Sequence, residues 1–175
     1  MTLRAYLRHS FIATGSLIAI TGYWGLANLQ LTLNGTTSLP EHAYLQWRWP
    51  LVLWHGAVVA VTPPEIFHGK LDGMQVVKRA VGFAGDVIVR KGEAVCLPDR
   101  CYMPLFEDGK PFAPPIAAGE IPKGQIAIFG DAPDSFDSRY ASFGLIPVED
   151  VQAVGVPLDA FPHWTEVAKW LGLSQ

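Results

Sequence analysis

The chain has 175 residues, which is enough for one sizeable domain and an appendage. Its net charge of −3 and isoelectric point of about 5.9 argue against nucleic-acid binding, which usually needs a basic footprint. Half of the residues are hydrophobic and only 17% are charged, and ordinary soluble domains have roughly a quarter, so this deficit indicates a membrane segment.

Residues 1–33 are predicted to form a cytoplasmic N-terminus and a transmembrane anchor. Residues 10–40 contain no charged side chain, and the largely apolar stretch 11–33 exceeds the roughly 20 residues that a spanning helix needs. Arg4 and Arg8 precede this stretch, and no Lys or Arg follows before Arg48. The positive-inside rule therefore keeps the N-terminus in the cytoplasm and sends residues 34–175 outward.

A cleaved signal peptide is the alternative for this segment. Gly25, Leu26 and Ala27 form a passable small-x-small cleavage site. The main domain is exported in either case. A buried core helix fits less well, because core helices seldom lack charge over so long a run.

Three consecutive hydroxyl residues, Thr36, Thr37 and Ser38, follow the anchor within NGTTSLPEHAY, residues 34–44. A polar loop would explain them. The alternative is that Ser38 is a nucleophile held at the bilayer surface. A serine hydroxyl is a poor nucleophile at neutral pH, so this alternative requires a base elsewhere in the chain.

Residues 44–56, YLQWRWPLVLWHG, place many apolar side chains close behind this serine. Tryptophan prefers the membrane–water boundary, so we hypothesise a platform that dips into the outer leaflet. Ordinary core packing is the alternative. The side chains concerned are Trp47, Trp49, Leu51, Val52, Leu53 and Trp54.

The exported part is predicted to be mainly β. Short segments rich in Val and Ile are separated by Gly, Pro and Asp, which is the pattern of strands and turns. Helical periodicity is found only at the C-terminus, where Trp164, Val167, Ala168 and Leu171 fall on one helical face. The predicted strands lie in residues 57–62, 74–83, 86–92, 125–130 and 151–158.

Lys78, within the predicted strand 74–83, is the candidate base. Alternation along a strand places Lys78 on one face with Val76 and Ala80, and Arg79 on the other. A lysine base must be neutral, and burial in apolar surroundings can lower its pKa by about three units at a cost of roughly 4 kcal/mol. The alternative is a sheet-edge lysine that guards against aggregation.

Histidine is the other kind of base. No histidine stands in a recognisable triad motif, and the chain has no G-x-S-x-G elbow. Because triads are defined by geometry, a histidine base remains an alternative. The five histidines are His9, His42, His55, His68 and His163.

Residues 91–122 are rich in Pro and Gly and are interpreted as an excursion from the main sheet. They contain both cysteines, Cys96 and Cys101, in the sequence CLPDRC. A local disulfide suits an oxidising compartment, and so short a loop would contribute roughly 2 kcal/mol. Two unrelated free thiols are the alternative. We predict no metal site, because no neighbouring His or second Cys pair completes a set of four zinc ligands.

Three sequence blocks, taken in order, resemble the signal peptidase I (S26) family of Ser/Lys proteases. The resemblance is greatest to its conjugative-transfer branch, the TraF-type pilin-processing peptidases. It covers about a quarter of the chain, and the third block is the most specific. The blocks are NGTTSLPEHAY (34–44), VVKRAVGFAGD (76–86) and GDAPDSFDSRYASFGLIP (130–147).

The resemblance implies a signal-peptidase-like β-fold with a Ser/Lys dyad, in which Ser38 is the nucleophile and Lys78 the general base. The Ser38 N–H and the Thr36 hydroxyl would form the oxyanion hole. Thr37 would serve only packing or hydrogen bonding.

The third block supplies supporting residues. The resemblance implies that Ser135 orients Lys78 by a hydrogen bond. A bare carboxylate against Lys78 would raise the lysine pKa, so we expect Asp137 to pair with Arg139 or Arg79 instead. A polar turn with a surface ion pair is the alternative for this block.

The chain departs from housekeeping signal peptidases at three positions. Leu39 stands where methionine typically follows the serine, Ala84 where proline is usual, and Ala132 where asparagine is common. These changes leave the nucleophile and the base in place. They favour the specialised branch over general preprotein processing.

The resemblance therefore implies a single-pass serine endopeptidase of the bacterial inner membrane, with a periplasmic catalytic domain and no cofactor. Its substrate would be a membrane-inserted precursor with small residues before the scissile bond, expected to be a conjugative pilin. The acyl group would pass to water or to an amine of the same chain, which gives a cyclic pilin. The lipid bilayer and a conjugation apparatus are further expected partners. The alternatives are a general leader peptidase and an inactive, anchored assembly factor of a conjugation or secretion apparatus.

Overall fold

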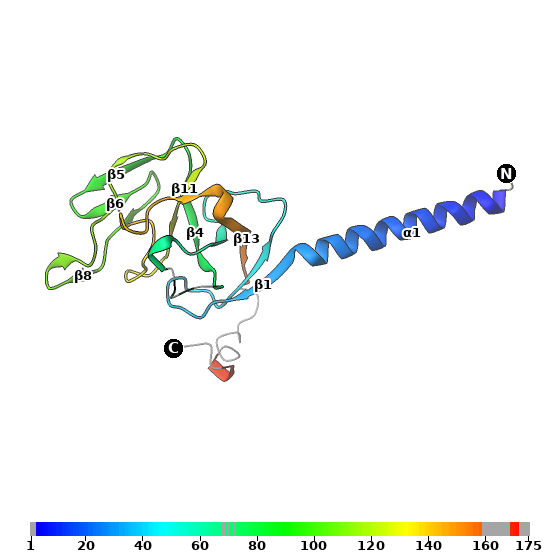
Figure 1. Ribbon diagram of the computed structural model, residues 1–175, viewed down its shortest axis with the longest axis horizontal. Helices are drawn as coiled ribbons and strands as arrows, with labels where there is room; N and C mark the ends of the chain where they lie inside the picture. The colour runs from blue at the N-terminus through cyan, green and yellow to red at the C-terminus, as the bar shows by residue number, and fades with distance from the viewer. Residues whose placement is uncertain (1–2, 68, 70, 72, 159–168, 172–175) are drawn as a thin grey trace.

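The computed structural model describes residues 3–67, 69, 71, 73–158 and 169–171. One long helix, α1 (Leu3–Asn28), projects from a mainly β domain (Figure 1). Its segment His9–Asn28 has a mean hydropathy of 1.3 and none of it is buried against the domain. The helix is therefore long and apolar enough to anchor the protein in a membrane.

The helix ends at Asn28 rather than at the expected residue 33. Leu29–Leu33 instead form strand β1, which pairs antiparallel with β2 (Ala43–Trp47). The cause lies in the sequence LQLTL, whose strict alternation of apolar and polar residues is typical of a strand. The chain thus enters the sheet directly from the helix.

Seven strands form the main sheet in the order β1–β2–β13–β3–β4–β11–β12. Each neighbouring pair is antiparallel. The strands not yet introduced are β3 (Val58–Val61), β4 (Val76–Gly82), β11 (Gln125–Phe129), β12 (Ile146–Pro147) and β13 (Val151–Pro157). Two short 3-10 helices, η1 (Glu65–Phe67) and η2 (Val148–Asp150), connect strands.

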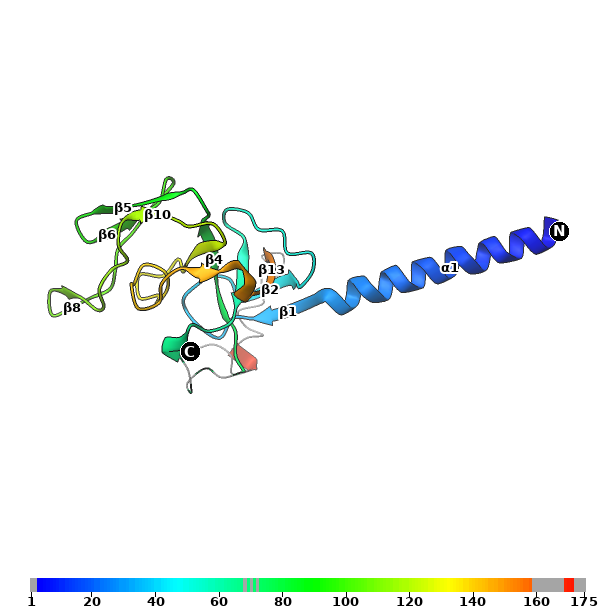
Figure 2. The same cartoon turned by 45° about the horizontal axis from the view of Figure 1, so that its top comes forward.

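A second sheet has the order β10–β5–β6–β7 and lies on the side of the domain away from α1 (Figures 1 and 2). It begins at residue 87, slightly before the predicted excursion 91–122. Its strands are β5 (Val87–Lys91), β6 (Ala94–Cys96), β7 (Cys101–Tyr102) and β10 (Gly119–Glu120). The hairpin of β8 (Phe106–Glu107) and β9 (Lys110–Pro111) extends from it.

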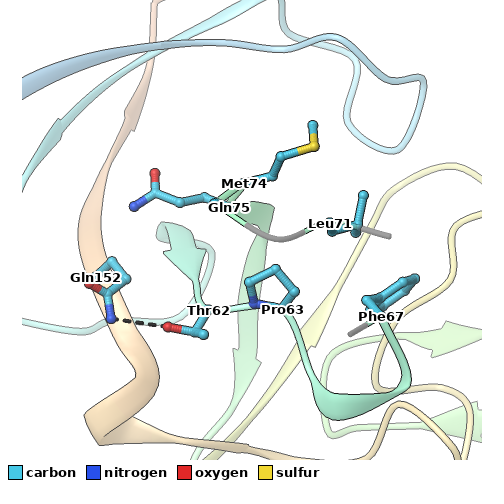
Figure 3. A pocket seen from close by; sticks show the side chains of 8 residues that line it. Thr62, Pro63, Phe67, Leu71, Met74, Gln75 and Gln152 are labelled. Atoms are coloured by element: carbon cyan, nitrogen blue, oxygen red, sulfur yellow. Dashed lines mark hydrogen bonds between the residues drawn. The ribbon is translucent and has the colours of Figure 1, made fainter. Parts of the chain in front are cut away.

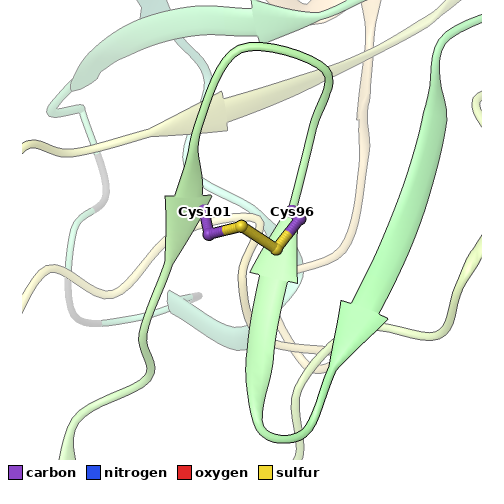
Figure 4. The surroundings of a disulfide bond; sticks show 2 residues. All are labelled: Cys96 and Cys101. Carbon is purple, nitrogen blue, oxygen red and sulfur yellow. A yellow bond between two sulfur atoms is a disulfide. The ribbon is translucent and has the colours of Figure 1, made fainter.

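Cys96 and Cys101 form a disulfide, as predicted, between register partners of β6 and β7 (Figure 4). No cysteine is free. Val95 and Tyr102 from the same hairpin are buried against Phe129 of β11. This packing joins the second sheet to the main sheet, because Phe129 belongs to a strand that lies beside β4.

The structure confirms core packing for part of the aromatic segment 44–56, whereas its predicted contact with the outer leaflet stays a prediction. Trp47 packs against the main core and stacks on Trp54, with ring centroids 5.8 Å apart, as core packing would require. Trp49 and Val52 stay exposed. Trp49 contacts Trp24 of α1 edge-on at 5.3 Å, so the segment also touches the helix.

The predicted C-terminal helix falls mostly outside the described residues. Trp164, Val167 and Ala168 are among those not described. Of the described residues 169–171, Trp170 and Leu171 are exposed.

Candidate active site

The loop between β1 and β2 carries Ser38, and hydrogen bonds from the Asn34 side chain connect the two ends of this loop. The Asn34 side-chain amide donates hydrogen bonds to the carbonyl oxygens of Leu39 (2.9 Å) and Glu41 (2.8 Å). One side chain therefore satisfies carbonyl groups on the far side of the serine, which fixes the shape of the loop. The sequence analysis missed this role, although asparagine is a residue that commonly hydrogen-bonds to nearby backbone in turns.

Thr36 is exposed at the rim of this loop. Its hydroxyl and its backbone N–H each donate to the Asn34 side-chain oxygen at 3.1 Å. The hydroxyl has one proton, so it must rotate away from Asn34 before it can donate to a substrate. The Ser38 N–H needs no such rotation before it can donate to a substrate, because it has no acceptor within the described part of the chain.

Lys78 is the third residue of β4 and lies opposite Val59 of β3. Its side chain is 5% exposed, and its Nζ donates to the Ser135 hydroxyl at 2.9 Å. Strand β4 lies between β3 and β11, so the sheet-edge alternative for this lysine is wrong. The structure brings Lys78 and Ser135 together as the resemblance implied.

Burial lowers the pKa of Lys78 from 10.5 to about 8, because the charged amine loses its hydration. The Asp137 carboxylate raises the pKa of Lys78, and the Arg139 guanidinium lowers it further. At a pKa of about 8, roughly one lysine in ten is neutral at pH 7, against roughly one in 3,000 for an unperturbed lysine. The environment thus keeps a useful fraction of the amine free to accept a proton.

Asp137 and Arg139 form a buried ion pair, with exposures of 0% and 2%. The Arg139 Nε and Nη2 groups donate to the two oxygens of the Asp137 carboxylate at 2.8 and 3.0 Å. Asp137 also accepts the Gly130 N–H at 2.7 Å, and Arg139 donates to the Gly130 carbonyl at 2.9 Å. The pair therefore fixes the loop 130–139, which presents Ser135 to Lys78. Of the two partners expected for Asp137, the structure selects Arg139, and the surface ion pair is excluded.

Gly130 lies where the loops of Ser38 and Ser135 meet. A Cβ atom at this position would lie 2.1 Å from the Ser135 hydroxyl oxygen and 2.8 Å from the Ser38 carbonyl oxygen. Since no real Cβ approaches other atoms so closely, only glycine fits here.

Arg79 points to the opposite side of β4, as strand alternation predicts, and pairs with two acids. Its Nε donates to Asp131 at 2.7 Å, and its Nη2 donates to Glu41. The Asp131 backbone N–H in turn donates to the Ser38 carbonyl at 2.8 Å. Arg79 thus joins β4 to both loops of the site. The sequence analysis predicted neither acid as its partner.

Ser38 and Lys78 line the same cavity, of about 540 Å³. Thr36, Asn34 and Gln75 add polar groups to its wall. The rest is mainly apolar and comes from Leu33, Phe67, Leu71, Met74, Val76, Val77 and Phe136. A half-buried hydroxyl and a buried amine therefore open onto one largely apolar space that a peptide segment can enter.

The described histidines, His9, His42 and His55, do not line this cavity. The His55 ring instead packs edge-on against Phe83 at 4.6 Å. His68 and His163 lie outside the described residues. Among the residues that the structure describes, no group of three or more His, Cys, Asp or Glu side chains could hold a metal ion.

Comparison with known proteins gives a family match for most of the chain. Residues 3–157 match the family described as signal peptidase, peptidase S26. No curated protein matches the chain. Among solved structures, a signal peptidase I from Enterococcus faecalis is similar, with 20% sequence identity, a TM-score of 0.38, and coverage of 59% of this chain and 97% of that one. The family match includes every residue assigned above to the site.

Proposed function

The chain belongs to the signal peptidase family S26, and from this membership we infer that it is a serine endopeptidase with Ser38 as nucleophile and Lys78 as general base. One observation carries the assignment of residues. A buried lysine with its pKa lowered to about 8 opens onto the same cavity as a half-buried serine.

The proposed reaction begins when neutral Lys78 takes the proton from the Ser38 hydroxyl as its oxygen attacks the scissile carbonyl. The Ser135 hydroxyl, which accepts a hydrogen bond from the Lys78 Nζ, holds the amine in place. Lys78 then returns the proton to the leaving amine, and an acyl-enzyme on Ser38 remains. Water or a second amine attacks this ester and releases the serine.

The developing oxyanion needs donors that are already in position. The Ser38 N–H, which has no acceptor among the described residues, supplies one, and the Thr36 hydroxyl supplies a second after it turns from Asn34. Each such donor is worth ~3 kcal/mol in proteases generally. The rotation of Thr36 accompanies substrate binding in this proposal.

We propose that the substrate is a membrane-inserted precursor, specifically a conjugative pilin, with small residues before the scissile bond. The replacement of the usual residues by Leu39, Ala84 and Ala132 supports the specialised branch over a general leader peptidase. Transfer of the acyl group to an amine of the same chain, which gives a cyclic product, is part of this proposal. Association with a conjugation apparatus follows from the same substrate.

We further propose that the protein keeps its helix as a single-pass anchor in a bacterial inner membrane, with the domain in the periplasm and against the lipid. Three exposed apolar residues, Leu31, Leu45 and Val156, are register partners across β1, β2 and β13. Trp24 of α1 contacts Trp49 of the domain, and the apolar row begins with Leu31, three residues after the end of that helix. A bilayer that holds α1 is well placed to cover it.

The proposed function is tested with full-length protein in detergent or vesicles and two precursors, a pilin precursor and an ordinary secretory precursor. We expect cleavage of the pilin precursor alone, and none by the Ser38→Ala variant. Cleavage of both would indicate a leader peptidase, whereas cleavage of neither would indicate an inactive assembly factor. Mass spectrometry of the product distinguishes a linear from a cyclic chain, since cyclisation removes one water.

The rate of cleavage is expected to rise with pH, because only neutral Lys78 can accept the serine proton. The pKa of Lys78 is lowered to about 8, so kcat/KM should increase about tenfold per unit below pH 8 and level off above it. A pH–rate profile at constant ionic strength measures this midpoint. A midpoint near 6.5 would instead indicate a histidine base.

A further inference from the structure

The hollow beside strand β13 extends the catalytic cavity and is not an independent site. It has a volume of about 420 Å³, and the Gln152 side chain in its wall donates to the Thr62 hydroxyl at 3.1 Å (Figure 3). Met74 and Gln75 line this hollow and the catalytic cavity alike. The disulfide hairpin of β6 and β7 instead contacts the loop 130–139, and the mechanism above gives this hairpin no role.

Arg100 stands in the turn that the disulfide closes. Cys96 and Cys101 are register partners, so their bond joins β6 to β7 at the turn 97–100 (Figure 4). Across this turn the Leu97 N–H donates to the Arg100 carbonyl at 2.9 Å, and the Arg100 N–H donates to the Leu97 carbonyl at 3.3 Å. The backbone of Arg100 is therefore held by two hydrogen bonds and by a covalent bridge at the next residue.

The Arg100 side chain extends from this turn to Asp131. Its Nη1 donates to the Asp131 carboxylate at 3.3 Å, and its guanidinium lies 5.0 Å from the centroid of the Tyr102 ring. Tyr102 is 8% exposed and packs on Phe129, with ring centroids 4.3 Å apart. Although the Arg100 side chain is 56% exposed, a buried ring supports its guanidinium, which an ordinary surface ion pair lacks.

Asp131 connects Arg100 to the nucleophile. One oxygen of its carboxylate accepts from Arg100, and the other accepts from Arg79 of β4 at 2.7 Å. The N–H groups of Asp131 and Ala132 both donate to the Ser38 carbonyl, at 2.8 and 3.2 Å. A shift of Asp131 would therefore displace the main chain of Ser38, which carries both the nucleophilic hydroxyl and the N–H proposed as an oxyanion donor.

The same hairpin also contacts the part of the loop that presents Ser135 to the catalytic lysine. The Tyr102 ring lies 5.7 Å from the Arg139 guanidinium, and the carbonyl of Met103, just after β7, accepts from the Arg139 Nη1 at 2.9 Å. Arg139 is 2% exposed, so these contacts lie inside the protein. The hairpin thus contacts the loop 130–139 at both of its ends.

We propose that Arg100 is a positioning residue for the peptidase reaction, which is held by the disulfide turn and fixes Asp131 and, through it, the main chain of Ser38. The proposal rests on the proposed peptidase function. It gives the second sheet a part in catalysis, since this sheet carries the turn. It also makes an oxidised hairpin a condition of full activity.

The first test compares Arg100→Met with wild-type protein, full-length in detergent, on a pilin precursor. We expect kcat to fall about tenfold with KM changed less than about twofold, because a reacting group displaced by ~1 Å can cost ~10²-fold in rate. The melting temperature should stay within about 4 °C, as expected for an exposed ion pair. Arg100→Lys keeps the charge and should restore most of kcat, and Lys91→Met, at an exposed cation of β5, is the matched control.

Two further readouts separate positioning from a general loss of structure. The charges that act on the pKa of Lys78 belong to Asp137, Arg139 and Asp134, so the midpoint of the pH–rate profile should stay at about 8 in Arg100→Met. In an Asp131→Asn background, Arg100→Met should change kcat less than about twofold, because the two residues act in one chain of contacts. A full tenfold effect in that background, or an unchanged kcat in Arg100→Met itself, would overturn the proposal.

Hydrogen exchange separates this proposal from the peptidase function, because it needs no turnover. The amides of Asp131 and Ala132 are bonded to the Ser38 carbonyl and should exchange about tenfold faster in Arg100→Met than in wild type, as expected when local opening becomes easier. Equal exchange in the two proteins would refute the role of Arg100, whether or not the precursor is cleaved. Faster exchange in a protein that cleaves no precursor would instead support the contact and refute the peptidase function.

Reduction of the disulfide tests the role of the turn. Dithiothreitol supplies two electrons and two protons, so that Cys96 and Cys101 become thiols while the reagent closes to its own cyclic disulfide. Cys101 is exposed and open to attack. Reduced wild-type protein should lose kcat about three- to tenfold, whereas Arg100→Met should change less than about twofold. No slowing of the wild type, or equal slowing of both proteins, would overturn the part assigned to the disulfide.

Discussion

Replacing Lys78 with methionine is expected to slow turnover sharply and, at the same time, to stabilise the protein. The Lys78 side chain is 5% exposed, and its pKa is lowered from 10.5 to about 8. A charged amine in this position costs about 3 kcal/mol at neutral pH, by the usual conversion of a pKa difference to free energy. Methionine fills similar space without this cost, whereas loss of the base should slow turnover by ~10²–10⁴-fold.

The stability of the wild type is expected to depend on pH, because the pKa of Lys78 differs between the folded and the unfolded chain. Between about pH 8 and 10.5 the unfolded chain holds a proton on Lys78 that the folded chain has released. Stability of the wild type should therefore rise with pH through this window, while that of Lys78→Met should not. The difference between the two proteins is largest below pH 8 and vanishes above 10.5.

Thermal melting in detergent, followed by tryptophan fluorescence, measures the effect. About 3 kcal/mol corresponds to roughly 6–12 °C for a chain of this size. Lys78→Arg is the matched control, because it keeps the charge buried and should lose turnover and stability together. A lower melting temperature for Lys78→Met than for the wild type at pH 7 would show that the buried amine is not costly, and the account of its pKa would fail.

The local features of this fold could be predicted because neighbouring residues determine them. The apolar helix, the Val-rich strands and the Cys96–Cys101 turn each depend on a short stretch of sequence. The end of the helix at Asn28 was also readable, since the alternation in LQLTL is a strand signal. The absence of charged residues, taken alone, predicts an anchor that continues to residue 33.

The bracing of the site could not be predicted, because it depends on contacts between distant segments. Arg79 meets Asp131, 52 positions away, only because the strands β4 and β11 are neighbours in the sheet. Glu41 reaches the same arginine from the Ser38 loop. No pattern within one segment encodes such pairs. Family resemblance therefore gave Ser135 and the Asp137–Arg139 pair, but not the two acids that bind Arg79.

Replacing Asp137 with asparagine is the second change with a large expected effect. It removes the only carboxylate that pairs with Arg139 within the described residues, and that guanidinium is 2% exposed. Removing one partner of a buried ion pair typically costs ~3–5 kcal/mol, and we expect a loss of stability in this range for Asp137→Asn. Glu93→Gln is the control, because the Glu93–Arg90 pair lies at the surface, where such pairs are worth about 0–1 kcal/mol.

Activity of the Asp137→Asn protein distinguishes a positioning residue from a merely structural one. The Asp137 carboxylate raises the pKa of Lys78 against the effect of burial, so its removal should move the midpoint of the pH–rate profile below 8 in whatever fraction remains folded. The loop 130–139 loses its anchor in the same variant, so Ser135 no longer holds the amine and kcat falls while KM changes little. If the midpoint stays at 8 and only the yield of folded protein drops, Asp137 stabilises the fold without acting on the lysine.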